Sequence, residues 1–258
     1  AILEDKEKGF IPACAVATIG TTSSGAVDPL VPVGDICRRH GLWLHVDAAY
    51  AGTAAVLPEK QWALKGVENA DSFVMNPHKW MFTNFDCSAF YVKDSRSLVR
   101  TFEIHPEYLK TGADAVVHNY RDWGIQLGRR FRALKLWFVL RSYGVEGIQA
   151  MVREHIRLAR LFKEMAEAEK HFRVMAPVHF SLVTFRFDDG RPETELNAFN
   201  EKLLGRINAG GKVFLTHTVL RGKYVIRLAV GQRTTEERHV RLAWDIVREA
   251  ASDLLGEG

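Results

Sequence analysis

Two residues with reactive side chains each follow a short apolar run in this sequence. Asp47 lies in the run His-Val-Asp-Ala-Ala-Tyr, and Lys79 lies in the run Asn-Pro-His-Lys-Trp. A lysine amine can bond covalently to a carbonyl carbon, and a carboxylate can keep a nearby nitrogen protonated. The pair therefore suits a carbonyl compound that also carries a basic nitrogen, with Asn76 and His78 as candidate hydrogen-bond partners.

Alternating strands and helices are expected to position these residues. The pattern predicts strands at residues 14–19, 42–46, 72–75 and 88–92, a helix at 33–40 and a Gly/Thr/Ser turn at 20–25. Such alternation favours an α/β fold with a mostly parallel sheet covered on both faces. Ligands of these sheets bind at the carboxyl ends of the strands, where Asp47 and Lys79 both fall.

The second half of the chain changes character. Helical spacing is predicted at 129–142, 147–170, 193–209 and 235–255, and strands at 181–187, 212–216 and 224–230. We therefore expect residues 1–142 to form part of a large domain, including a mobile loop at 104–123. Residues 143–258 are expected to form a connecting helix and a small α+β domain.

Composition excludes several classes of protein. The 35 Lys and Arg residues nearly balance the 31 Asp and Glu residues and are spread along the chain, which argues against nucleic-acid binding. The longest apolar runs are much shorter than the ~20 residues of a membrane span. Three cysteines, Cys14, Cys37 and Cys87, lack metal-ligand spacing, and no secretory segment precedes them. We expect a cytoplasmic protein without a metal site.

Lys79 and Asp47 together fit a pyridoxal-5'-phosphate (PLP) site. Such a site needs a lysine for the Schiff base, a carboxylate on the pyridine nitrogen and donors for the phosphate. Taken alone, each residue has a simpler explanation, since Asp47 could cap a helix, Lys79 could be a solvated charge and His78 could be a surface histidine. Their coincidence at consecutive strand ends, beside a small Ala-Ala pair, favours the PLP site.

Several motifs resemble one family of PLP enzymes, the group II decarboxylases of fold type I. They are Thr18-Ile-Gly-Thr-Thr22, His45-Val-Asp-Ala-Ala-Tyr-Ala-Gly52, Ala70-Asp-Ser-Phe73, Asn76-Pro-His-Lys-Trp80, Asn84-Phe-Asp-Cys-Ser88, Gly128-Arg-Arg-Phe-Arg132 and Leu136-Trp-Phe-Val139. Within that family the sequence most resembles the aromatic-L-amino-acid decarboxylases that act on dopa or tryptophan.

The resemblance implies a role for each matched residue. Lys79 would hold the cofactor covalently, Asp47 would contact the pyridine nitrogen, and Ala49 would pack on the ring face. Three further positions would bind the cofactor, namely Thr22 near the ring substituents and Asn76 and His78 at the phosphate.

Three residues bear on reaction and substrate. Tyr108, on the predicted loop, would supply the proton that completes decarboxylation, although an aromatic residue could also simply anchor the loop. Gly128 would leave space for a large ring such as indole or catechol, unless it is a helix-packing glycine. His78 stands where histidine decarboxylases carry Ser, which disfavours histidine as the substrate.

The expected reaction is decarboxylation of an aromatic L-amino acid to its amine. Alternatives are an aromatic aldehyde synthase of the same family, which typically carries Phe at the position of Tyr108, a decarboxylase of acidic amino acids, and a non-catalytic interaction subunit. The resemblance also implies a homodimer. Family members have an upstream segment with a phosphate-binding turn and a ring-stacking histidine that this chain lacks, so we expect the chain alone to be inactive.

Overall fold

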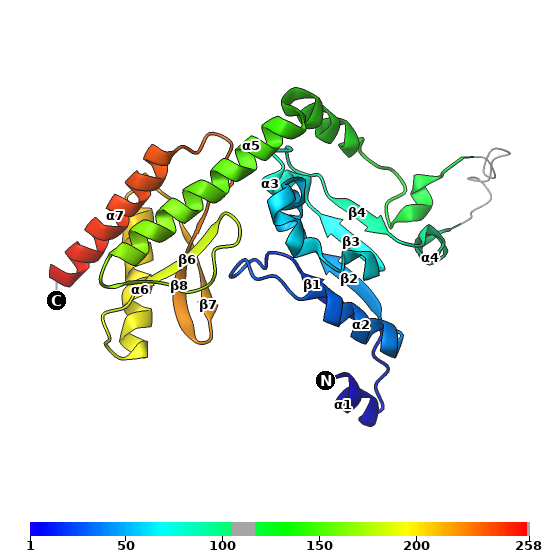
Figure 1. Cartoon of the computed structure of the whole chain (residues 1–258), viewed down its shortest axis with the longest axis horizontal. Coiled ribbons are helices and arrows are strands. Elements are labelled where there is room, and N and C mark those ends of the chain that lie inside the picture. Colours follow the sequence, from blue (N-terminus) through cyan, green and yellow to red (C-terminus); the bar gives the residue numbers. More distant parts are fainter. Residues whose placement is uncertain (105–116, 257–258) are drawn as a thin grey trace.

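The computed structural model describes residues 1–104 and 117–256 and contains two sheets joined by a long helix (Figure 1). In order, the elements before the long helix are α1 (Ile2–Glu7), β1 (Cys14–Thr18), α2 (Leu30–His40), β2 (Trp43–Asp47), the 3-10 helices η1 (Ala51–Val56), η2 (Pro58–Leu64) and η3 (Val67–Asn69), β3 (Ser72–Met75), α3 (Pro77–Trp80), β4 (Ala89–Val92), α4 (Ser95–Phe102) and η5 (Tyr120–Trp123). The long helix is α5 (Arg132–Ala168), and β5 (Phe172–Val174), β6 (Leu182–Phe187), α6 (Glu193–Ala209), β7 (Thr216–Leu220), β8 (Lys223–Ala229) and α7 (Glu237–Gly256) follow it.

The first sheet has the order β1-β2-β3-β4 in the described residues. β1 and β2 are parallel, as are β2 and β3, whereas β4 runs antiparallel to β3 at the edge. The predicted mostly parallel sheet is therefore confirmed with one reversed edge strand. Its expected cover on both faces is incomplete within this chain, because Val16 in the middle of β1 is 60% exposed.

Local sequence explains how α2 leads into the strand that carries Asp47. The helix ends at Gly41, whose left-handed backbone (φ 69°) suits a residue without a side chain. The amide of Gly41 donates to the carbonyl of Arg38, and the amide of Leu42 donates to that of Cys37, so the last turn is closed. The chain then enters β2, where Leu44 and Val46 are fully buried.

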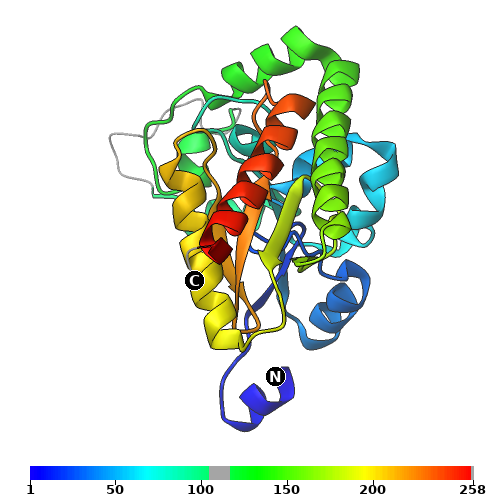
Figure 2. The same cartoon turned by 90° about the vertical axis from the view of Figure 1, so that its left-hand side faces the viewer.

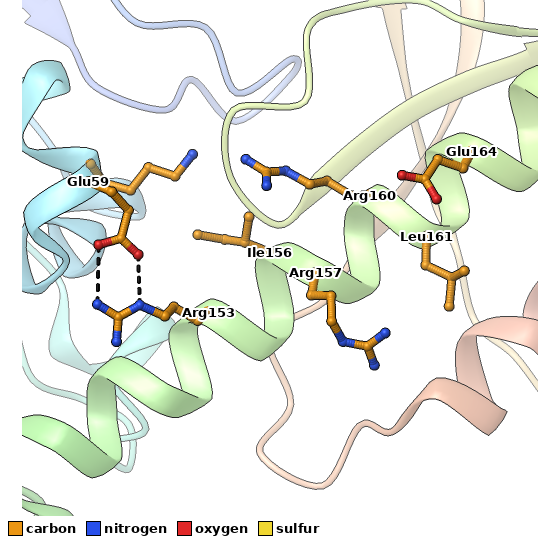
Figure 3. Close-up of a pocket in the computed structure, with 8 residues that line it drawn as sticks. Glu59, Arg153, Ile156, Arg157, Arg160, Leu161 and Glu164 are labelled. Atoms are coloured by element: carbon orange, nitrogen blue, oxygen red, sulfur yellow. Dashed lines mark hydrogen bonds and ion pairs between the residues drawn. The ribbon is translucent and has the colours of Figure 1, made fainter.

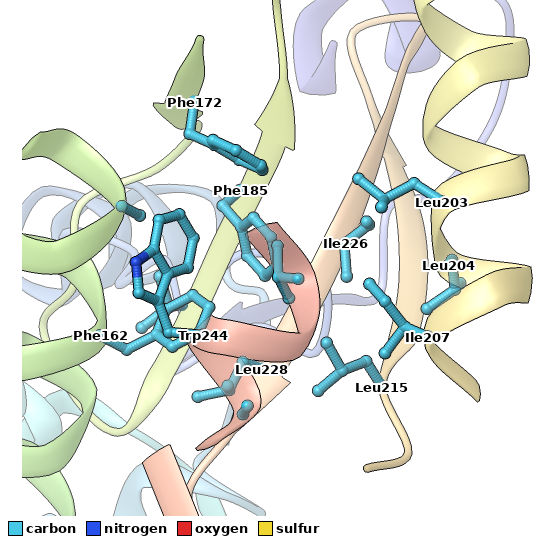
Figure 4. Close-up of a cluster of buried hydrophobic side chains, with 14 of the residues drawn as sticks. Phe162, Phe172, Phe185, Leu203, Leu204, Ile207, Leu215, Ile226, Leu228 and Trp244 are labelled. Atoms are coloured by element: carbon cyan, nitrogen blue, oxygen red, sulfur yellow. The ribbon is translucent and has the colours of Figure 1, made fainter. Parts of the chain in front are cut away.

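The second sheet, in the order β5-β6-β8-β7, is antiparallel throughout its described strands. Helices α5, α6 and α7 pack on one face of it (Figure 2). Figure 4 shows the core between them, with Phe162 of α5 and Trp244 of α7 beside Phe185 of β6. All three rings are at most 5% exposed, and burying each contributes about 1.5–3 kcal/mol.

Helix α5 connects the two sheets and belongs to both cores. Its middle part contributes Ile148, Val152 and Ile156 to the core of the first sheet. Its last part contributes Leu158 and Phe162, among others, to the core of the second sheet. Because one helix serves both cores, the two sheets are held together by apolar packing.

Several predicted boundaries differ from the structure. The two helices expected at 129–142 and 147–170 are confirmed as the two segments of α5, which meet at a kink at Gly144 with a non-helical backbone (φ 65°, ψ 174°), although the first segment begins at Arg132. The strand expected at 212–216 lies instead at Thr216–Leu220, and β5 was not predicted. Within the described residues, no helix is long and apolar enough to cross a membrane.

Candidate active site

The register of the first sheet brings the predicted residues to one edge. Asp47, the last residue of β2, lies opposite Thr18 of β1 on one side and Val74 of β3 on the other. Two residues after Val74, the chain leaves β3 at Asn76 and turns into α3, which carries Lys79. The carboxyl ends of β2 and β3 therefore place the segments of Asp47 and Lys79 side by side.

The Asp47 carboxylate is held by its own backbone turn. Oδ1 accepts a hydrogen bond of 2.9 Å from the amide of Ala49, as aspartate often does two residues ahead of itself. Oδ2 has no hydrogen-bond or ion-pair partner within the described part of the chain, although the residue is half-buried. One carboxylate oxygen is thus fixed, and the other can receive a proton donor.

The two segments are joined by backbone hydrogen bonds. The amide of Asn76 donates to the carbonyl of Ala49 at 3.0 Å, and the amide of Ala48 donates to that of Val74 at 2.9 Å. These bonds fix the segment after Asp47 against the segment before Lys79. The relative position of the two reactive residues is therefore set by the sheet and does not depend on side-chain contacts.

Lys79 lies in the short helix α3, which begins at Pro77. Proline at the first helical position costs no hydrogen bond and pre-sets the backbone angle. The Lys79 side chain is exposed, and neither a hydrogen bond nor an ion pair of its amine occurs among the residues described. The amine is therefore available for a covalent bond.

His78 and Asn76 are fixed by the loop that precedes β4. The His78 Nδ1 lies 3.0 Å from the amide of Cys87, which donates to it, and 2.7 Å from the carbonyl of the same residue. The Asn76 Oδ1 accepts a 2.6 Å hydrogen bond from the hydroxyl of Ser88. Neither the Nε2 of His78 nor the side-chain amide nitrogen of Asn76 has a hydrogen-bond partner in the part of the chain that the structure describes, so both can contact an anionic group.

Thr22 lies in the turn between β1 and α2 and is exposed. The turn itself is rigid, since the Thr21 hydroxyl accepts from the amide of Ala26 at 3.1 Å and Asp28 accepts from the amide of Thr18 at 2.7 Å. Gly20 has φ 79°, and a Cβ there would lie 2.5 Å from that of Ala51. The turn thus presents Thr22 at the same sheet edge as Asp47.

Sequence reasoning missed the aromatic support behind Lys79. The indole of Trp80 is fully buried, stacks on the ring of Tyr50 at 4.9 Å, and donates from Nε1 to the Nδ1 of His155 at 3.0 Å. Tyr50 hydrogen-bonds the hydroxyl of Ser181, and burial raises the pKa of Tyr50 to about 12. The only sequence signal for this aromatic support was that Tyr50 and Trp80 are the aromatic residues that follow Asp47 and Lys79 in their motifs.

Two predicted residues are not part of the group described above. Tyr108 lies outside the described residues. Gly128 precedes α5 and is exposed, and a Cβ added there would meet nothing within 4 Å. Among the described residues, therefore, no helix packs against Gly128, and its place in the substrate pocket stays a prediction.

The donor set fits PLP in three respects. Among the residues that the structure describes, Oδ2 of Asp47 has no partner and suits a protonated pyridine nitrogen, the amine of Lys79 has no competing partner, and the small side chain of Ala49 suits the face of a flat ring. Within the described residues no group of His, Cys, Asp and Glu is arranged to hold a metal ion.

A profile of the pyridoxal-dependent decarboxylase conserved domain matches residues 1–188. The chain belongs to this family. The cofactor predicted from Lys79 and Asp47 is thereby confirmed as pyridoxal phosphate, which is also present in a solved structure similar to this chain.

Relatives in this family include both decarboxylases and an aldehyde synthase. Tyrosine decarboxylase 2 of Arabidopsis thaliana is 50% identical over 98% of the chain and 47% of its own length. Phenylacetaldehyde synthase of Arabidopsis thaliana is 48% identical over 99% of the chain and 53% of its own length. The Oryza sativa TDC solved with PLP and tryptamine has a TM-score of 0.95 and 41% identity, covering 98% of the chain and 53% of that structure. The chain thus spans about half the length of these relatives.

Proposed function

We propose that this chain is the lysine-bearing part of an enzyme that decarboxylates an aromatic L-amino acid to its amine and carbon dioxide. The observation that carries the proposal is the fixed pair of Asp47 and Lys79, whose free carboxylate oxygen and free amine lie on hydrogen-bonded segments at one sheet edge. Relatives named as tyrosine and tryptophan decarboxylases support the aromatic substrate.

Each residue would have a defined part in the reaction. Lys79 would bind the cofactor covalently until substrate replaces it, and Asp47 would hold a proton on the pyridine nitrogen. PLP, when bound, supplies the electron sink for the pair of electrons left on the α carbon as carbon dioxide leaves. Ala49 would pack on the ring, Thr22 would contact its substituents, and Asn76 and His78 would bind the phosphate.

Tyr108 would deliver the proton that the α carbon needs after carbon dioxide leaves. A phenol can donate this proton and recover one from solvent, and a positioned general acid contributes about 100- to 10,000-fold. An aldehyde synthase is the second candidate, because phenylacetaldehyde synthase of Arabidopsis thaliana is 48% identical to this chain. The tyrosine at position 108 favours the decarboxylase, since the synthases typically carry Phe there.

Product analysis tests the reaction. The complete enzyme that contains this chain, with PLP bound, should convert tyrosine, tryptophan or dopa to the amine in equal yield under air and under argon. Aldehyde, ammonia and peroxide formed only under air would support the synthase, and no conversion of any aromatic amino acid would contradict both. Tyr108→Phe should lower the rate of amine formation and divert product to aldehyde under air.

Organisation beyond the site is also proposed. Residues 1–142 would form part of the large PLP-binding domain, including the catalytic loop 104–123, and residues 143–258 the connecting helix and small C-terminal domain. The active unit would be a homodimer, which the exposed apolar side chains of Trp137 and Phe138 on α5 support. It would be cytoplasmic, which the three unpaired cysteines support. Light scattering that detects an active monomer would contradict the dimer.

A further inference from the structure

A pocket outside the candidate active site lies between η2 and one face of α5 (Figure 3). Its volume is about 400 Å³, which falls within the range of small-molecule sites. The residues that line it are Glu59, Lys60, Arg153, Ile156, Arg157, Arg160, Leu161 and Glu164. Those from α5 recur every three or four residues, so a single helical face forms one wall.

Two of the four cations in this lining are already neutralised. The guanidinium of Arg153 makes a two-point contact with the carboxylate of Glu59, at 2.7 and 3.2 Å. Arg157 hydrogen-bonds Glu154 at 2.8 Å and Glu237 at 2.9 Å, and neither of these carboxylates lines the pocket. These ion pairs hold Arg153 and Arg157 in place at the sides of the pocket, and the carboxylates balance the charges of both guanidinium groups.

The other two cations, Lys60 and Arg160, lie outside these ion pairs, although the Lys60 ammonium lies over the ring of Phe180, 5.8 Å from its centroid. Neither has a carboxylate within ion-pair distance in the described residues. Lys60 is only 8% exposed, and its ammonium donates to the carbonyl of His179 at 2.6 Å, which uses one of its three N–H groups. Figure 3 shows Arg160 reaching across the pocket toward η2, with Glu164 at the far end.

This arrangement is electrostatically unfavourable without an anion. Burial lowers the pKa of Lys60 and the neighbouring Arg160 lowers it further, whereas Glu59, already paired with Arg153, partly offsets both effects. A buried cation is costly unless a counter-charge or hydrogen bonds replace its hydration. A dianion between Lys60 and Arg160 would match both charges.

We propose that this pocket binds a small phosphate ester through Lys60 and Arg160. Arginine offers paired N–H donors to phosphate oxygens, and lysine offers a compact charge. The pocket is larger than an inorganic ion needs, and Ile156 and Leu161 provide an apolar wall for the remainder of the ligand. The proposal rests on this pocket alone and is independent of the decarboxylase activity.

Calorimetric titration of the whole protein, loaded with PLP and then freed of unbound PLP by gel filtration, tests the proposal. The cofactor held in the candidate active site keeps phosphate probes out of it, and no excess PLP is left to occupy the pocket between η2 and α5. Glycerol 3-phosphate should bind saturably, whereas glycerol should not. Inorganic phosphate should bind more weakly than glycerol 3-phosphate. Equal affinity for the two would overturn the ester assignment, and no saturable heat with either would overturn the site.

Three variants separate this site from general charge effects. Arg160→Gln, at an exposed position, should weaken glycerol 3-phosphate binding by about tenfold or more. Glu164→Gln should strengthen it, because the variant removes a carboxylate from the same pocket. Arg248→Gln on α7, which removes an equal charge away from the pocket, should leave binding unchanged. Unchanged affinity in Arg160→Gln, or an equal loss in Arg248→Gln, would contradict the proposal.

Discussion

The hydrogen bond between Trp80 and His155 should stabilise the segment that carries Lys79. The indole Nε1 donates to the His155 Nδ1 at 3.0 Å, and the two residues are 0% and 2% exposed. His155→Leu would keep an apolar side chain of similar reach but leave the indole N–H without its acceptor. A buried polar group left unpaired costs about 1–3 kcal/mol, so we expect the free energy of unfolding to fall by that amount.

The contribution of His155 to the free energy of unfolding should depend on pH. Burial lowers the pKa of His155 below its ordinary value of 6.5, so the folded protein keeps the imidazole neutral where the unfolded chain would take up a proton. The contribution of the neutral His155 to the free energy of unfolding should therefore be complete above pH 6.5. It should be lost progressively as the pH falls below 6.5. The Leu variant should lack this component of the pH dependence.

Urea unfolding at several pH values, for the wild type, the single variants and Trp80→Phe/His155→Leu, would measure both effects. The double variant removes donor and acceptor together, so its loss should be smaller than the sum of the single losses by about 0.5–3 kcal/mol. Additive losses, or a His155→Leu variant within about 0.5 kcal/mol of wild type with the same pH dependence, would refute the reasoning.

Asp47→Asn removes the charge that we propose to lie at the pyridine nitrogen. It should lower turnover by at least about 100-fold, as does the loss of a preorganised electrostatic contact, and a loss under about tenfold would contradict the role. The free energy of unfolding of the wild type should decrease as the pH rises from 10 toward 12, because Tyr50 loses its proton near pH 10 in the unfolded chain but has a pKa of about 12 in the folded protein. Tyr50→Phe should lack this decrease, and identical alkaline unfolding curves for the two proteins would contradict the prediction. Gly128→Ser should leave stability within about 0.5 kcal/mol, because the added Cβ meets nothing within 4 Å. It should also lower kcat/KM for tryptophan relative to tyrosine by about tenfold, and an unchanged ratio would exclude Gly128 from the substrate pocket.

Local sequence predicted the elements whose signals are local. The strand at Ser72–Met75 and the helix at Glu193–Ala209 have the predicted bounds, because apolar spacing and flanking turns define them. The strand expected at 212–216 was misplaced, because its register depends on pairing with β8 across the Arg221-Gly222 turn, where both residues have positive φ. The reversed direction of β4 likewise depends on which strand it meets and not on its own residues.

The site was predictable where it follows the strand ends. Asp47 and Lys79 could be placed together because parallel strands end at a common edge. The hydrogen bonds from Trp80 to His155 and between Tyr50 and Ser181 could not be predicted. The partners of each bond are at least 75 residues apart in the sequence, so no local pattern indicates them. Incomplete cover of the first sheet agrees with a chain that spans about half the length of its relatives.

Borohydride reduction of the protein with PLP, followed by peptide mass spectrometry, tests the central assignment most directly. The reduced cofactor should be found on the peptide that contains Lys79, and the visible absorbance of the bound cofactor should be lost at the same time. Lys79→Ala should give no labelled peptide while still folding. Label on another lysine such as Lys60, or an unmodified Lys79 in an active preparation, would contradict the assignment.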